Sequence, residues 1–323
     1  MSSPNSKLPN LGSKTEEFIS MIEEMDTPPL YKMTPENARN FLNKLQEKTH
    51  QEIEADVTDT AIFTDAMDNV EVRVVRPKNN NEKLPAIIYV HGGGWILGNK
   101  NVYDMLTRKL ACCTNSVVIF PEYMLAPEGT YPTQTDQIYA TLQYIYENPN
   151  EFNIDRDKIA IVGDSVGGNM ATVTALRTKN EKGPKLLFQC LFYPVTSADM
   201  DTKSYDDFKD GPWLTKKAME WFWDTYQPDK KLRNDPYISP LNAEIDDLKG
   251  LPPALIVTDE NDVLRDEGEA YARKLDLAGV DVLNVRVNGT FHDFLMLNGL
   301  ADTPQAKGTL EMACTILKKV LHS

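Results

Sequence analysis

The sequence contains no long apolar run and only four cysteines, Cys112, Cys113, Cys190 and Cys314. Their spacing matches no zinc-ligand pattern, and the two adjacent cysteines would rarely bridge each other. We therefore expect reduced, mostly buried thiols, which are usual in a cytosolic protein. No apolar run approaches the length of a membrane span, and residues 1–10 lack the apolar core of a signal peptide. These absences predict a cytoplasmic protein that does not bind membranes.

Positive charge is in the minority. The chain has 34 Lys and Arg against 48 Asp and Glu, which gives a formal net charge of −14. Nucleic acids and anionic membranes attract basic surfaces, so this balance argues against either of them as the main partner. The apolar content of 41% is ordinary for a globular protein, and 323 residues can form one large core with a smaller covering element.

The most informative stretch is residues 163–168, Gly-Asp-Ser-Val-Gly-Gly. The short apolar run at 158–162 predicts a buried strand, and residues 169–176 predict the beginning of a helix. Gly-x-Ser-x-Gly at a strand-to-helix turn is typical of a nucleophile elbow, in which small flanking residues leave the serine hydroxyl exposed. Ser165 is therefore the candidate nucleophile. The alternative is a glycine-rich turn with an incidental serine.

A serine hydroxyl becomes a good nucleophile only when a base takes its proton. The chain has four histidines. Of these, His292 follows the last predicted strand, residues 282–287, and precedes the last predicted helix, residues 304–321. In proteins with a nucleophile elbow the chain order is serine, acid, histidine, so His292 is the candidate base. A structural histidine is the alternative.

The acid is expected in the loop after the strand predicted at 253–258. Several carboxylates lie there, and some of them must be solvated charges at the beginning of a helix. Asp262 is the first choice because it lies before the helix predicted to begin near Leu264. Asp259 is the alternative. The acid would orient the imidazole and stabilise its charged form.

A second glycine-rich stretch, His-Gly-Gly-Gly-Trp at 91–95, directly follows a continuous apolar strand predicted at 85–90. Acyl transfer passes through a tetrahedral oxyanion that needs preorganised hydrogen-bond donors. Glycines let bare amides turn toward such a site, and the amide after the nucleophile adds another donor. A flexible turn is the alternative. The candidate oxyanion-hole residues are Gly92, Gly93, Gly94 and Val166.

From residue 85 onward, predicted strands and helices alternate. This alternation predicts an α/β fold with a mostly parallel sheet and helices on both faces. Before it, valines at positions 70, 72 and 74 alternate with charged residues, which favours an antiparallel strand. We read one catalytic domain, residues 51–323, and no internal repeat.

Two regions do not fit the alternation and are predicted to form a cap over the serine. Residues 1–50 contain two amphipathic helices, the first opened by a capping box at 13–16 and the second by Pro35. An insertion at about 197–245 holds most of the tryptophans. An ordinary helix packed on the sheet is the alternative for the insertion. The candidate substrate-binding residues are Trp95, Trp213, Trp221 and Phe222.

Together these motifs resemble the hormone-sensitive-lipase family of carboxylesterases, the HGGG-type or bacterial family IV α/β-hydrolases. The resemblance extends over about residues 86–294. It implies a central sheet of about eight strands with a helical cap. It also implies Ser165 as nucleophile, Asp262 as acid and His292 as base. Further matching segments are residues 125–128, 193–194, 239–241 and 262–268, and the implied oxyanion donors are Gly93, Gly94 and Val166.

The chain departs from the family at four positions. Val166 and Val263 stand where the family usually has Ala and Pro. Arg and His often occupy the places of Met124 and Gly129. Val166 keeps its backbone N–H but adds bulk beside the oxyanion hole, so we expect an effect on acyl-pocket size and rate and none on the mechanism.

These features predict a serine carboxylesterase that hydrolyses small esters with short acyl chains and needs no metal or organic cofactor. Two alternatives remain. The first is a non-catalytic protein that binds a small ligand, as in the plant gibberellin receptors, which resemble this family but lack the catalytic histidine. The second is an amidase or peptidase, although such relatives usually carry a propeller or a long insertion. Family members are often homodimers, and the sequence leaves this open.

Overall fold

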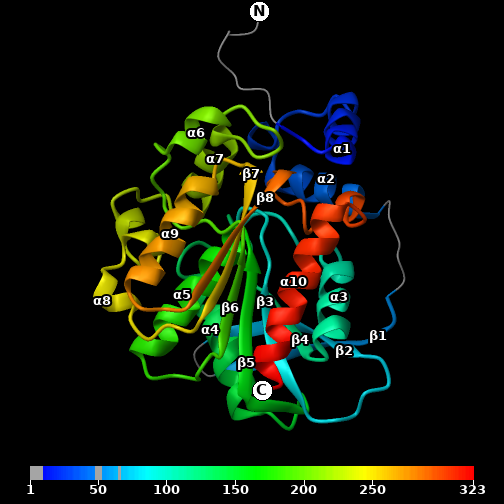
Figure 1. Cartoon of the computed structure of the whole chain (residues 1–323), viewed down its shortest axis with the longest axis vertical. Helices are drawn as coiled ribbons and strands as arrows, with labels where there is room; N and C mark the ends of the chain where they lie inside the picture. Colours follow the sequence, from blue (N-terminus) through cyan, green and yellow to red (C-terminus); the bar gives the residue numbers. More distant parts are fainter. Residues whose placement is uncertain (1–9, 48–52, 65–66) are drawn as a thin grey trace, which may run out of the picture.

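One sheet of eight strands organises the molecule in the computed structural model, which describes residues 10–47, 53–64 and 67–323. The strand order is β1-β2-β4-β3-β5-β6-β7-β8 (Figure 1). β2 pairs antiparallel with both β1 and β4, and the other neighbours are parallel. The mostly parallel α/β fold and its antiparallel beginning are confirmed. The strands are β1 (Ala55–Thr64), β2 (Met67–Pro77), β3 (Leu84–Val90), β4 (Val117–Glu122), β5 (Ile154–Asp164), β6 (Phe188–Phe192), β7 (Ala254–Asn261) and β8 (Val282–Phe291).

Helices cover both faces of the sheet. α3 (Asp104–Thr114) and α10 (Pro304–Leu321) lie on one face (Figure 1). α4 (Thr133–Glu147), α5 (Val166–Asn180) and α9 (Arg265–Leu277) lie on the other. Within the described residues no helix is both long enough and apolar enough to span a bilayer.

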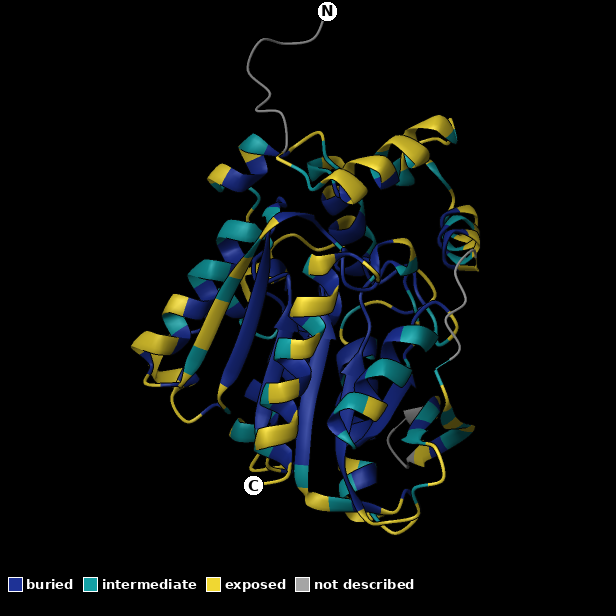
Figure 2. Ribbon diagram, turned by 45° about the vertical axis from the view of Figure 1, so that its right-hand side comes forward, coloured by how far each residue is buried: buried dark blue, intermediate teal, exposed yellow. Residues whose placement is uncertain are grey.

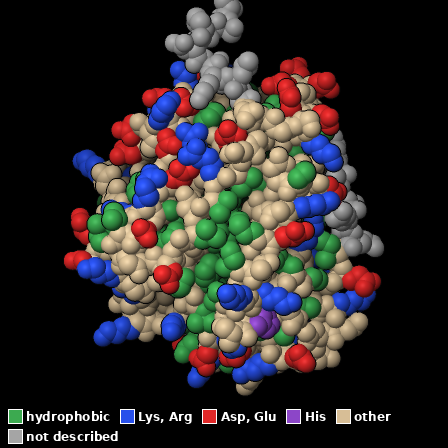
Figure 3. All heavy atoms as spheres, viewed as in Figure 1, with side chains coloured by type: hydrophobic (Ala, Val, Ile, Leu, Met, Phe, Trp, Pro, Cys, Tyr) green, Lys and Arg blue, Asp and Glu red, His purple; other side chains and the backbone are tan. Residues whose placement is uncertain are grey.

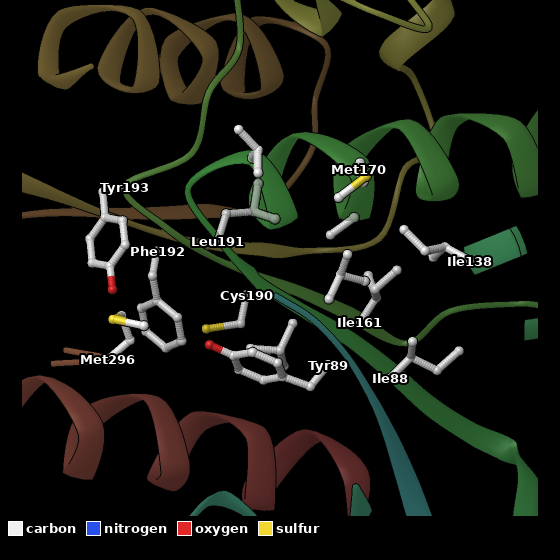
Figure 4. Packing of buried hydrophobic residues seen from close by; sticks show 14 of the residues in the cluster. Ile88, Tyr89, Ile138, Ile161, Met170, Cys190, Leu191, Phe192, Tyr193 and Met296 are labelled. Carbon is white, nitrogen blue, oxygen red and sulfur yellow. The ribbon is translucent and has the colours of Figure 1, made fainter. Parts of the chain in front are cut away.

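The central strands are buried on both sides, which explains their continuous apolar sequence. Every residue of β3 is buried, whereas β8 at the edge is intermediate or exposed over residues 282–288 and buried only at 289–291 (Figure 2). Figure 4 shows part of this core, with Tyr89 from β3, Ile161 from β5 and Cys190 from β6. On the face shown in Figure 3, acidic and basic side chains are interspersed.

The N-terminal helices and the insertion lie together at the end of the sheet where the parallel strands finish (Figure 1). This end carries α1 (Ser13–Glu24), α2 (Pro35–Glu47), α6 (Lys203–Asp207) and α7 (Lys216–Tyr226). α8 (Ile245–Leu248) follows the insertion. The predicted cap therefore has both of its parts in one place. Its boundaries with the catalytic domain stay a prediction.

The two N-terminal helices begin at different kinds of cap. Pro35 is the first residue of α2, and Thr34 Oγ1 accepts a hydrogen bond from the N–H of Asn37, as the sequence predicts. The prediction of a capping box at residues 13–16 is wrong, because Gly12 is the N-cap of α1 and no side chain caps this helix. The N–H of Gly12 donates to Gly289 O at 3.0 Å, so a contact with β8 fixes where α1 begins.

The prediction of reduced thiols is wrong for two of the four cysteines. A disulfide joins Cys113 of α3 to Cys314 of α10, with 5.8 Å between their Cα atoms. Their sequence separation of 201 residues leaves no local signal. Cys112 is exposed and Cys190 is buried, and both are free. Reduced thiols are one reason to expect a cytosolic protein, and the disulfide removes that reason.

Breaking this disulfide should destabilise the protein. Closure of so long a loop restricts the unfolded chain, so Cys314→Ser should lower the free energy of unfolding by about 2–4 kcal/mol. Thermal unfolding without reductant measures this effect, with Cys112→Ser as the matched control that should leave Tm unchanged. Equal Tm values for oxidised wild type and Cys314→Ser would show that the bond adds no stability.

Candidate active site

Ser165 lies at a strained turn between β5 and α5. Its φ of 55° is unusual for a residue other than glycine. The turn is tight: a Cβ at Gly163 would collide with the backbone of Gly167, and one at Gly167 would collide with the carbonyl of Val90. Glycine is therefore required at both flanking positions. This is the geometry predicted for the motif.

The loops after β7 and β8 bring two further predicted residues to the serine. His292 Nε2 lies 2.9 Å from Ser165 Oγ, and His292 Nδ1 lies 2.8 Å from Asp262 Oδ2. The N–H of Leu264 donates to Asp262 Oδ1 at 3.0 Å and fixes the carboxylate at the beginning of α9. All three members of the chain Ser165, His292 and Asp262 are buried.

Asp259, the alternative acid, lies beside this chain without joining it. Its Oδ1 accepts a hydrogen bond from Thr290 Oγ1 at 3.1 Å. Burial and the nearby Asp262 raise the pKa of Asp259 well above its usual value. The structure therefore places Asp262 on His292.

The surroundings of His292 favour its charged form. Burial alone would lower the pKa of His292, but the carboxylates of Asp262 and Asp293 outweigh this and raise it. Asp262 and Asp293 both lie within 3.4 Å of a ring nitrogen. An imidazolium formed when His292 takes a proton would thus be stabilised at once.

The glycine loop faces the serine, although its first glycine has another role. The N–H of Gly92 donates to Asp164 Oδ1 at 3.0 Å and to the hydroxyl oxygen of Tyr103 at 3.1 Å. Gly92 is therefore not an available oxyanion donor, which corrects its place among the candidates. The N–H groups of Gly93, Gly94 and Val166 have no acceptor among the described residues.

Asp164 is the residue that sequence reasoning missed. Its buried carboxylate accepts hydrogen bonds from the hydroxyls of Tyr89 (2.9 Å) and Tyr103 (2.8 Å) as well as from Gly92. Burial raises the pKa of Asp164 to about 7 against the effect of these donors. The available signal was an acid directly before the serine, but the donors come from two segments far from it in the sequence, residues 89–92 and Tyr103. Asp164 joins the elbow to the glycine loop.

An apolar cavity opens over Ser165 and His292 between the cap and the sheet. Trp213 and Phe222 line it, as predicted. Trp95 does not, because it is fully buried and stacks on Tyr226 with 4.1 Å between ring centroids. Trp221 also lies outside the lining and packs against Phe222. The other lining residues are Leu30, Phe41, Leu42, Gly93, Gly94, Leu97, Tyr103, Leu214, Asp293 and Met296.

Among the described residues, Asp259, Asp262 and His292 form the only group spaced closely enough to hold a metal ion. Asp262 and His292 use their ligand atoms on each other, and Thr290 donates to Asp259. Hydrogen bonding therefore accounts for this cluster.

Comparison with known proteins agrees with the site. A family model described as the alpha/beta hydrolase fold matches residues 87–296. An α/β hydrolase of Acanthamoeba polyphaga mimivirus is 43% identical over 96% of this chain and 88% of its own. Carboxylesterase NlhH of Mycobacterium tuberculosis is 34% identical over 89% and 90%. The crystal structure of a thermostable esterase from Pseudomonas putida matches with a TM-score of 0.95, 41% identity and 99% coverage of both chains.

The geometry predicts a selectively reactive serine. A fluorophosphonate probe should label Ser165, because His292 can take the proton as the oxygen attacks phosphorus. Loss of that base in His292→Ala should slow labelling by at least about 100-fold. Peptide mass spectrometry after timed labelling measures both site and rate. Ser197→Ala, which removes another buried hydroxyl, should label normally, and a label that is insensitive to His292 would contradict the assignment.

Proposed function

The chain belongs to the α/β-hydrolase family that contains the hormone-sensitive-lipase-like esterases, and we propose that it is a serine carboxylesterase for small esters with short acyl chains. The observation that carries this proposal is the continuous hydrogen-bonded chain from Ser165 through His292 to Asp262. Esterases and carboxylesterases among the relatives support the reaction class.

In the proposed reaction Ser165 Oγ attacks the ester carbonyl while His292 Nε2 takes the hydroxyl proton. Asp262 Oδ2 accepts the hydrogen bond from Nδ1–H, which fixes the tautomer that leaves Nε2 free as the base. Nε2–H then protonates the leaving alcohol oxygen as the carbon–oxygen bond breaks. Water attacks the resulting acyl-enzyme and gives a proton to Nε2. Nε2–H then protonates Ser165 Oγ as the carbon–oxygen bond to the serine breaks, which releases the acid and restores the free serine.

The oxyanion would be held by the backbone N–H groups of Gly93, Gly94 and Val166. These amides are unpaired among the described residues, and both glycines line the cavity. One such donor typically contributes about 3–4 kcal/mol of transition-state stabilisation. The side chains and amides of the chain supply every group in this scheme, so we propose no metal or organic cofactor.

The cap supports the proposed preference for short acyl chains. The ring of Phe222 in α7 packs directly on Gly94, where even a Cβ would collide with it. Phe222 therefore limits the room beside the oxyanion loop. The side chain of Val166 is fully buried and does not line the cavity, so this proposal depends on Phe222. The continuous hydrogen bonds from Ser165 through His292 to Asp262 argue against a protein that only binds a ligand. Amide substrates distinguish the other alternative, an amidase or peptidase.

The first test is hydrolysis of p-nitrophenyl esters from acetate to dodecanoate, with p-nitroanilides as the amide counterparts. We expect turnover of short esters, a decline with chain length, and little activity on the anilides. Ser165→Ala and His292→Ala should lower kcat by several orders of magnitude. A folded wild-type protein that is inert toward all these esters would overturn the esterase proposal and favour a ligand-binding role.

The second test is the pH dependence of kcat/KM. His292 must be neutral to act as a base, and its pKa is raised, so activity should be present above that pKa and lost as the pH falls through it. Asp262→Asn removes the carboxylate that contributes most to raising the His292 pKa. The acid side of the pH profile should therefore move to lower pH, while kcat falls by about 10⁴-fold. Asp259→Asn is the matched control, with a loss below about tenfold. A larger loss in Asp259→Asn than in Asp262→Asn would reverse the assignment.

A further inference from the structure

Asp293, the residue directly after His292, places a second carboxylate at the reactive end of the cavity. It lines the cavity, and its side chain is 17% exposed. Oδ2 accepts a hydrogen bond from the indole N–H of Trp213 at 2.9 Å. Oδ1 is buried and receives no hydrogen bond from any residue in the described part of the chain. One oxygen of Asp293 is therefore fixed by the cap, and the other is unsatisfied.

The unsatisfied oxygen is close to the atoms that react. Asp293 Oδ1 lies 3.4 Å from His292 Nε2, and the same nitrogen lies 2.9 Å from Ser165 Oγ. In the proposed mechanism Nε2–H protonates the leaving alcohol oxygen, which must come within about 3 Å of Nε2. Oδ1 is thus placed beside the alcohol part of a bound ester.

A buried carboxylate oxygen without a donor is costly, and a substrate that supplies the donor removes that cost. A site built around such an acceptor rejects the analogue that lacks the donor more strongly than a purely apolar pocket could. A hydroxyl or a protonated amine two carbons from the ester oxygen can reach an acceptor at this distance from Nε2. An alkyl group of the same shape leaves Oδ1 unpaired.

We propose that Asp293 determines specificity for the alcohol part of the substrate and favours esters whose alcohol carries a hydroxyl or a protonated amine near the ester oxygen. This inference rests on the proposed esterase function. Trp213 acts as a positioning residue, since its indole N–H orients the carboxylate from the cap. Esters of diols, polyols and amino alcohols are the substrate class that fits.

The test compares two shape-matched pairs of butanoate esters, all four measured at one pH at which wild type is active and the tertiary amine is protonated. The first pair is 2-(dimethylamino)ethyl butanoate, protonated on nitrogen, and 3-methylbutyl butanoate. The second is 2-hydroxyethyl butanoate and propyl butanoate. In wild type, kcat/KM should favour the donor-bearing ester of each pair by at least about tenfold. Ratios near one in wild type would overturn the inference by themselves, whatever the variants do.

Asp293→Asn supplies the second measurement. The amide oxygen can still accept from Trp213, which turns the amide NH₂ toward the reactive side. The kcat/KM ratio within the amine pair should then fall to near one, while any change in the stabilisation of His292 affects both esters of the pair equally and cancels in the ratio. A uniform loss on all four esters would overturn the inference and leave Asp293 as a group that only stabilises the imidazolium.

Two control variants separate the effect of the Asp293 carboxylate from the effects of net charge and of misfolding. Asp276→Asn removes an exposed carboxylate at the far end of α9 and makes the same change in net charge, so it should keep the wild-type ratios. Trp213→Phe should lower the ratios without removing the carboxylate, which keeps the test usable if Asp293→Asn fails to fold. Wild type that hydrolyses none of the four esters would contradict the proposed function itself, whereas hydrolysis without discrimination contradicts only the role of Asp293.

Discussion

The buried carboxylate of Asp164 is the interaction on which the site depends. It lies between the elbow at the end of β5 and the glycine loop at the end of β3, and it accepts from Tyr89, Tyr103 and Gly92. Tyr103 is the N-cap of α3, so one side chain ties two strands and a helix together. Without it the N–H of Gly92 would keep only the Tyr103 hydroxyl as an acceptor, and that hydroxyl would lose its own tie to the elbow, so the loop would be held less firmly with its next two amides toward Ser165. The cost of burying a charge is visible in the raised pKa of about 7.

The cap is joined to the sheet by polar contacts as well as by apolar packing. Arg39 of α2 donates to the carbonyls of Ile96 and Ala126 and forms a bidentate pair with Glu128. The buried amide of Gln46 donates to the carbonyls of Val102 and Met296. Ile96 follows the glycine loop and Met296 follows His292, so these bonds fix α2, which contributes a wall of the cavity. Trp213 makes the matching contact from the insertion.

Features set by neighbouring residues could be predicted from the sequence, and features set by distant ones could not. The elbow, the bounds of α10 and the antiparallel β2 follow from local spacing and periodicity. The disulfide, the start of α1 against Gly289 and the direction of the Gly92 N–H depend on tertiary contacts. The aromatic candidates show the same limit, because only tertiary packing decides that Trp213 lines the cavity while Trp95 stacks in the core.

Three carboxylates, Asp262, Asp259 and Asp293, surround His292, and each accepts hydrogen bonds from different donors. Asp262 Oδ1 accepts from the N–H of Leu264, and Asp262 Oδ2 lies 2.8 Å from Nδ1 of the imidazole. Asp259 is buried and receives, within the described part of the chain, only the Thr290 hydroxyl, and its raised pKa favours the neutral acid. Asp293 is oriented by Trp213 from outside the catalytic loops. Carboxylates this close to one another cannot all ionise at equal cost, and their surroundings differ accordingly. Asp262 pairs with the catalytic histidine, Asp259 is buried in the core, and Asp293 faces the cavity.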